Sequence, residues 1–152
     1  MQGSPHCEWY RTKGARLKNE ADYNYSSDSV FDTFPWPQSP TSTQIGAVAA
    51  AAVEVRQIRA KALKITTGGL RDIYRTLELP GKHPLKDAHA ALDAALLAAY
   101  GFDAKKDLLA QLLELNLTVA ALEKQGKKVT APGVPPSYPD ATKLVTEDCI
   151  KP

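Results

Sequence analysis

The sequence predicts a mainly α protein: a small helical bundle of about four helices, preceded by a short β/turn segment and followed by a Pro-rich extended C-terminal tail. Three observations lead to this prediction. Apolar residues repeat with helical spacing between residues 41 and 126. Seven of the eleven Phe, Trp and Tyr residues lie in the first 40 residues. Five of the eleven prolines follow residue 126. We therefore expect three parts, residues 1–40, 41–126 and 127–152.

The first part contains the run Ser29-Val-Phe-Asp-Thr-Phe-Pro-Trp-Pro-Gln38. Its apolar residues, Val30, Phe31 and Phe34, are interspersed with polar ones, which predicts a short strand. Pro35 and Pro37 would end this strand, because neither can donate to a ladder. Trp36 is then fixed between two prolines, where its ring either plugs the edge of a hydrophobic core or stacks on a base.

A capping box predicts the start of the first long helix. In Thr41-Ser-Thr-Gln44 the threonine hydroxyl would accept a hydrogen bond from the first turn while Gln44 reaches back. The helix should run to about Ile65, with a narrow apolar stripe suited to close helix packing. Its other faces are either solvated or contact phosphates. They carry Arg56, Arg59, Lys61 and Lys64.

Three further helices complete the predicted bundle. A short one spans residues 70–77 and stops at Leu79-Pro-Gly81. The next begins at Pro84, whose missing N–H costs nothing in a first turn, and ends at a left-handed Gly101. The last is capped by Asp103 and runs to about Lys124. Together these helices should bury one bundle core.

Two features of the helical part allow both a chemical and a structural interpretation. Gly68-Gly69 is either a turn between helices or a phosphate-binding loop, for which the preceding strand is missing. His89 lies on an apolar face with Asp93 one turn later. This pair is either a core histidine held by a carboxylate or a catalytic pair, for which no nucleophile is evident.

Basic and aromatic residues near the start of the chain form the best candidate binding site. The run Arg11-Thr-Lys-Gly-Ala-Arg-Leu-Lys18 has four basic residues and no acidic one, and Gly14 would allow close backbone approach. Arginine grips guanine with two hydrogen bonds, lysine suits phosphate, and tyrosine can stack. The alternative is an ordinary charged hairpin. The candidate DNA-binding residues are Arg11, Lys13, Arg16, Lys18 and Tyr25.

Composition indicates a protein of the cytoplasm. The chain has 43% hydrophobic and 24% charged residues, a net charge of +2, and no apolar run of membrane-spanning length. Its first residues lack the pattern of a secretory signal. Cys7 and Cys149 have no partner at metal-ligand spacing, so we expect neither a zinc site nor a disulfide framework.

Several motifs, in their order along the chain, resemble the MmeI-like, type IIL restriction-modification family of adenine-specific DNA methyltransferases. The matching positions of the first part are Trp9, Gly14, Arg16, Leu17, Lys18, Tyr23, Tyr25, Ser26, Phe34, Pro35, Trp36 and Pro37. Later matches are Leu70-Arg-Asp-Ile-Tyr74, Leu85 to Ala95, Ala98 to Phe102, Leu113 to Leu117 and Pro135-Pro-Ser-Tyr-Pro139. The segment Asn19-Glu-Ala-Asp22 is longer than the family's spacer, which alters the expected loop there.

The resemblance implies the end of a target recognition domain followed by a helical C-terminal domain, with double-stranded DNA and the rest of the methyltransferase as partners. A chain of 152 residues is too short for the complete enzyme. The parent would bind S-adenosylmethionine, but this chain has neither a Gly-rich cofactor turn nor a Pro-Pro-aromatic loop for a flipped base. Val134-Pro-Pro-Ser137 lacks the polar side chain and the aromatic ring that such a loop needs.

We therefore expect this chain to carry no catalytic, cofactor-binding or metal-binding residue. Its predicted function is to contribute to DNA target recognition and clamping as the C-terminal part of the methyltransferase. The alternative is a free-standing helical protein-interaction module with no DNA role. A small independent DNA binder is a weaker idea, because a net charge of +2 gives little nonspecific attraction.

Overall fold

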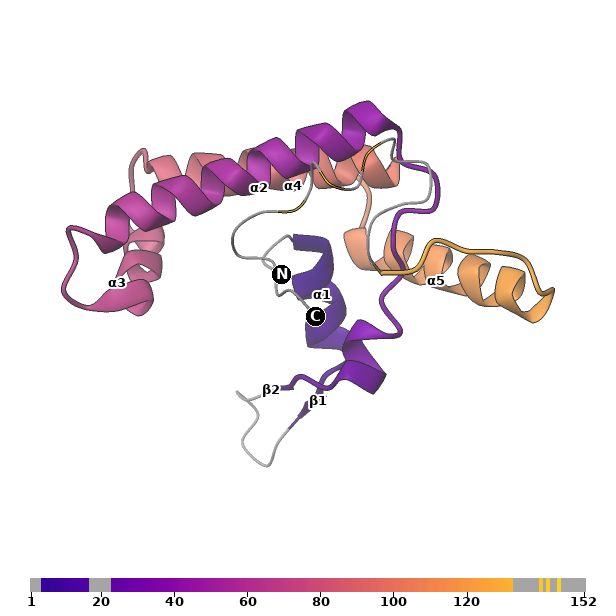
Figure 1. Ribbon diagram of the computed structural model, residues 1–152. Helices are drawn as coiled ribbons and strands as arrows, with labels where there is room; N and C mark the ends of the chain where they lie inside the picture. Colours follow the sequence, from indigo (N-terminus) through magenta and orange to yellow (C-terminus); the bar gives the residue numbers. More distant parts are fainter. Residues whose placement is uncertain (1–3, 17–22, 133–139, 141, 143–144, 146–152) are drawn as a thin grey trace.

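The computed structural model describes residues 4–16, 23–132, 140, 142 and 145, which form two adjoining parts (Figure 1). One part is a pair of long helices with a short helix at its far end. In the other part, the start of the chain packs against the last helix. The prediction of a mainly α fold with a small β segment is confirmed.

The helix pair consists of α2 (Ser42–Leu63) and α4 (Pro84–Tyr100), which run antiparallel along their length (Figure 1). They are joined through α3 (Gly69–Arg75) and the 3₁₀ turn η2 (Thr76–Glu78). The predicted capping box is present, with Thr41 Oγ1 accepting from Gln44 N at 3.2 Å. Pro84 starts α4 and Gly101 ends it at φ 68°, as predicted. Gly68-Gly69 lies at the turn into α3.

The core of this helix pair is aliphatic and made of side chains at helical spacing. Its buried members are Val55, Ile73, Leu85, Ala88 and Leu92. Small residues of α2, including Ala51 and Ala52, pack against it and allow the helices to approach closely. We call this cluster the aliphatic core.

The beginning of the chain is helical, which was not predicted. Helix α1 spans Ser4–Lys13 and buries Trp9. It is followed by a short antiparallel hairpin of β1 (Ala15–Arg16) and β2 (Tyr23–Asn24).

The strand expected from Ser29 is wrong: residues Ser27–Phe31 form η1, a turn of π-helix. Local side-chain hydrogen bonds favour this turn, because Ser26 Oγ accepts from Ser29 N and Thr33 Oγ1 donates to Ser29 O at 2.7 Å. Val30 and Phe34 are four residues apart and both buried, a spacing that also fits one face of a helical turn.

A second core surrounds Trp9, so the expectation of one bundle core is wrong. Its buried members are Trp9, Val30, Phe34 and Leu112. Partly buried Tyr10, Trp36, Tyr100, Phe102 and Leu108 pack against it. We call this cluster the aromatic core. The last helix, α5 (Leu108–Lys124), supplies Leu112 to this core and packs on α1.

Helix α5 starts later than predicted. Its N-cap is Asp107, whose Oδ1 accepts from Ala110 N at 2.7 Å. Asp103, the predicted cap, instead accepts from Lys105 N in the preceding turn. Two aspartates four residues apart both satisfy the capping pattern, and the periodicity of the helix does not choose between them.

Polar contacts hold the two parts together. Both oxygens of Asp93, on α4, accept hydrogen bonds from Ser4: Oδ1 from the backbone N at 2.8 Å and Oδ2 from the hydroxyl at 2.5 Å. Within the second part, Asn116 Nδ2 of α5 donates to Thr33 O at 2.9 Å. The boundaries at residues 40 and 126 stay predictions, while the aromatic core combines residues from both sides of residue 40.

The segment after α5 returns along that helix (Figure 1). It is tied to the Pro-Trp-Pro segment by Gln38, whose Oε1 accepts from Thr130 N at 2.9 Å and whose backbone O accepts from Thr130 Oγ1 at 3.0 Å. Most of the predicted extended tail, including Val134-Pro-Pro-Ser137 and Cys149, lies outside the described residues. In the part of the chain that is described, no helix is long and apolar enough to cross a membrane.

Candidate nucleic-acid interface

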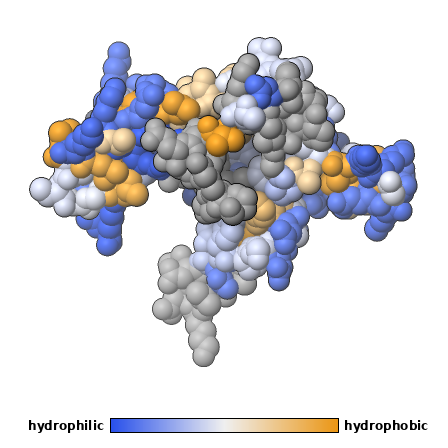
Figure 2. All heavy atoms as spheres, in the orientation of Figure 1, coloured by the Kyte–Doolittle hydropathy of each residue, from blue (hydrophilic) through white to orange (hydrophobic). Residues whose placement is uncertain are grey.

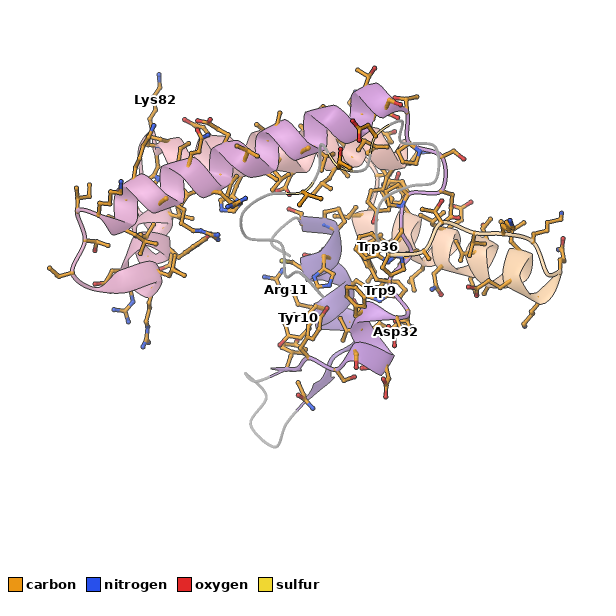
Figure 3. All side chains as sticks on the ribbon, viewed as in Figure 1. Trp9, Tyr10, Arg11, Asp32, Trp36 and Lys82 are labelled. Carbon is orange, nitrogen blue, oxygen red and sulfur yellow. The ribbon has the colours of Figure 1, made fainter. Side chains whose placement is uncertain are left out.

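The basic end of α1 is the best-defined part of the predicted site. Arg11, labelled in Figure 3, and Lys13 are both exposed in the last turn of this helix. Arg11 Nη1 forms an ion pair with Glu8 Oε1 at 2.9 Å. The ammonium of Lys13 lies 5.1 Å from the centroid of the Trp9 ring. Contact of Arg11 with a phosphate or base would therefore require it to leave Glu8, whereas Lys13 is held by a cation–π contact.

The tyrosines mostly support the hairpin rather than project from it. Tyr10 OH donates to Tyr23 O at 2.6 Å, and their rings lie 5.7 Å apart. Tyr25 is 47% exposed, with its ring 5.6 Å from Tyr10 and its hydroxyl 3.1 Å from His6 Nε2. Of the three, Tyr25 keeps the ring surface that stacking on a base would need.

The rest of the predicted run leads into the hairpin. Arg16 lies in β1 opposite Tyr23, and Lys18 lies outside the described residues. A Cβ on Gly14 would sit 2.7 Å from Tyr10 O and 3.2 Å from Asn24 O. The close approach that Gly14 permits is therefore to the chain's own backbone, where α1 turns into β1, and not to DNA.

His6 links this surface to the aromatic core. It is 8% exposed, and its ring lies 5.1 Å from Phe34 in an edge-on contact. Burial lowers the pKa of His6, because the charged imidazolium loses its hydration there. The neutral ring is thus favoured, with one nitrogen facing the Tyr25 hydroxyl.

Trp36 packs as part of the core. Its ring makes edge-on contacts with Phe34 at 5.2 Å and with Phe31 at 5.9 Å, and its Nε1 is buried without a protein acceptor among the described residues. Tyr100 OH donates to Pro35 O at 3.0 Å. Burial raises the pKa of Tyr100 well above its usual value, so this donor keeps its proton. The plug interpretation of Trp36 fits this geometry.

A surface pocket of about 350 Å³ lies beside Trp36, between the Pro-Trp-Pro segment, α5 and the returning segment. Charged and amide side chains on its rim include Lys13, Asp32, Asn116 and Glu123; Figure 3 labels Asp32 and Trp36. Sequence reasoning missed this pocket. No local signal could have shown it, since its lining combines residues 13–36 with residues 116–132, at least 80 positions further along the chain.

The expected contact between His89 and Asp93 is wrong. Asp93 is occupied by Ser4, and His89 Nε2 instead lies 3.3 Å from the hydroxyl of Tyr74. The reason is tertiary: the carboxylate satisfies the free amide at the start of α1, which sequence spacing on α4 cannot reveal. Among the described residues, no group of three His, Cys, Asp or Glu side chains could hold a metal.

Comparisons with known proteins give this arrangement a context. No protein-family model matches the chain. The chain is 30% identical over 113 residues to "DNA methyltransferase A" of Bacillus subtilis (strain 168), a match that covers 72% of this chain and 12% of that protein. It also matches a structure of the type IIL restriction-modification enzyme MmeI in complex with DNA, with a TM-score of 0.65, 30% identity, and coverage of 79% of this chain and 15% of that one.

The fold and these two matches show that the chain is similar to a region of restriction-modification DNA methyltransferases. More particularly, the chain is MmeI-like, as its motifs predicted. It spans less than a sixth of the length of either of the two proteins that it matches.

Proposed function

We propose that this chain is the C-terminal part of an S-adenosylmethionine-dependent, adenine-specific DNA methyltransferase, in which it contributes to target recognition and to clamping of the DNA. The observation that carries the proposal is the likeness, at 30% identity and a TM-score of 0.65, to part of MmeI in complex with DNA. Cofactor binding and methyl transfer are assigned to the rest of the parent protein. This chain and the rest of the parent protein act in the cytoplasm.

In this proposal the hairpin side of the molecule meets the base pairs. Arg16 and Lys18 contact bases or phosphates, and Tyr25 stacks. Arg11 and Lys13 add cations at the adjoining end of α1. The ion pair between Arg11 and Glu8 is exposed and therefore weak, so exchange for a phosphate costs little.

Substitution of Arg16 in the parent enzyme tests this role. Arg16→Ala should change site preference or weaken specific binding by about 1–3 kcal/mol, the usual cost of losing a direct base contact. Lys105→Ala is the control, because Lys105 is exposed on the connection between α4 and α5. Methylation is mapped across genomic sites for both variants. Unchanged methylation at the same sites in the Arg16 variant would contradict the role.

The alternative function, a helical protein-interaction module, is favoured by one observation. Large aliphatic side chains are exposed at the far end of the helix pair, among them Ile65 at 88% and Leu79 at 62%. A module of this kind would keep its stability and its partner when Arg11, Lys13 and Arg16 are all replaced by Gln. The DNA-recognition role would lose duplex binding in the same variant.

A further inference from the structure

The far end of the helix pair carries the positive charge of this chain. Residues 54–87 contain eight of the nineteen Lys and Arg but four of the seventeen Asp and Glu. The remaining residues therefore hold more acidic than basic side chains. A positive surface on a nearly neutral chain is the electrostatic footprint of a polyanion partner.

Four of these cations are exposed where α2 ends and α3 begins. They are Lys61, Lys64, Arg71 and Arg75, which we call the basic tip. Among the described residues none of the four forms an ion pair. Arg11 differs, because Glu8 already neutralises it. The basic tip thus offers charge without first breaking a contact.

Their spacing places like charges side by side. Lys61 lies in the last turn of α2 and Lys64 is the C-cap of that helix, three residues later, while Arg71 and Arg75 are four residues apart on α3, so each pair lies on one side of its helix. On α3 the buried Ile73 fixes the orientation: Arg71 and Arg75 lie on the opposite side, away from the aliphatic core.

Figure 2 shows hydrophilic side chains projecting around this end of the molecule. Lys82 belongs to the same end but projects from the side of the helix pair that faces away from α1 (Figure 3). It therefore serves as a comparison within the same region, with the same charge and similar exposure.

We propose that the basic tip is a second DNA contact, which binds the phosphate backbone without reading sequence. This inference rests on the proposed function. Two lysines and two arginines without a paired acceptor suit phosphates. Clamping of the duplex then has a physical site, separate from the hairpin that reads bases. The tip sets affinity and salt dependence, and the hairpin sets site preference.

The test measures binding of the full 152-residue chain to two unrelated DNA duplexes over a range of salt concentrations. The slope of log K against log salt is negative, and Arg71→Gln/Arg75→Gln should reduce its magnitude by about two. Each lost phosphate contact means that about one counterion fewer is released on binding. Affinity should fall by the same factor for both duplexes. Lys61→Gln/Lys64→Gln, on a different helix, should repeat the result.

The matched control is Lys105→Gln/Lys106→Gln, which removes two exposed charges between α4 and α5. This pair, and Lys82→Gln, should leave the slope unchanged. An equal fall in the control pair would show that only net charge matters and would overturn the proposal. Unchanged slopes for both tip pairs would also overturn the proposal. The same conclusion holds if Ile65→Ser is found, in addition, to abolish binding of the chain to a protein partner.

Failure of the tip can be distinguished from failure of the proposed function. If the tip variants keep the wild-type slope while Arg16→Ala weakens binding, the basic tip is wrong and the recognition role stands. If the wild-type chain shows no salt-dependent binding to either duplex, both are wrong. Circular dichroism of each variant checks that its helical content equals that of the wild type.

Discussion

The two cores of this molecule are built in different ways. The aliphatic core joins α2, α3 and α4, which follow one another along the chain and pack through apolar residues at helical spacing. The aromatic core combines the first 40 residues with the end of α4 and with α5. Its aromatic side chains meet edge to face, and hydrogen bonds such as Trp9 Nε1 to Thr33 Oγ1 fix their orientation.

The helix pair around the aliphatic core is therefore a scaffold, whereas the aromatic core is a junction between distant segments. A core of neighbouring helices needs only local sequence, so it can present the basic tip at one end as a rigid support. A core drawn from segments far apart in the chain is stable only when those segments meet, and α1, which carries Arg11 and Lys13, contributes Trp9 to it. In the proposed function, recognition and clamping therefore depend on different packing. The predictions below test that separation.

Both tryptophans of the chain lie in the aromatic core, so tryptophan fluorescence reports that core, while circular dichroism reports mainly the helices. Leu112→Ala should lower the free energy of unfolding measured by fluorescence by about 2–5 kcal/mol, because Leu112 is fully buried. Leu117→Ala, at a 70% exposed position of the same helix, is the control and should change it by about 0.5 kcal/mol or less.

The two signals also test whether the cores unfold separately. Separate cores predict that Leu112→Ala shifts the fluorescence transition in guanidinium more than the transition seen by circular dichroism. Coincident transitions, shifted equally, would show that the two cores form one cooperative unit. A loss below 1 kcal/mol would contradict the placement of Leu112 in the aromatic core.

The same difference explains how far the sequence predicts this structure. The capping box at Thr41 and Gln44, the start at Pro84 and the stop at Gly101 were predictable because each depends on a few adjacent residues. The π-helical turn at Ser27 and the cap at Asp107 were not. In each case two local patterns competed, and the sequence alone did not decide between them.

For the candidate site, the sequence indicated the residue types but not their contacts. It did not show that Glu8 pairs with Arg11, that Gly14 serves the turn out of α1, or that Lys13 lies over Trp9. The DNA roles of Arg11, Lys13, Arg16, Lys18 and Tyr25 stay predictions. Trp36 was predicted as a plug or a stacking surface, and its ring contacts Phe31 and Phe34 of the same segment.

The link between the two cores should matter less than either core. Asp93→Ala removes both acceptors of Ser4 and leaves the first amide of α1 unsatisfied, which should cost about 1–2 kcal/mol in the free energy of unfolding. Asp93→Asn keeps one acceptor and should cost less. Asp87→Ala is the control, since Asp87 is exposed in the first turn of the same helix.

Chemical denaturation of these three variants separates a cap from a general charge effect. An equal loss in Asp87→Ala and Asp93→Ala would contradict the cap and point to the charge of α4 instead. A loss in Asp93→Ala that appears only in the fluorescence signal would sharpen the comparison, because it would show that the contact stabilises the aromatic side and not the helix pair.

Acidification should have the smallest effect, because it acts on the aromatic core through the single residue His6. Burial lowers the pKa of His6 in the folded state relative to about 6.5 in the unfolded chain. The unfolded state therefore takes up a proton first as the pH falls. The stability present above the unfolded pKa is then lost progressively as the pH falls toward the folded value.

The measurement is the free energy of unfolding, followed by tryptophan fluorescence, for the wild type and His6→Gln between pH 8 and pH 5. The wild type should lose stability below about pH 6.5, and His6→Gln should flatten this part of the profile. Equal pH profiles for the two proteins would exclude His6 as the cause. A wild-type loss seen equally in helical content would mean that the proton acts on both cores, so that the aromatic junction and the helix pair respond as one structure.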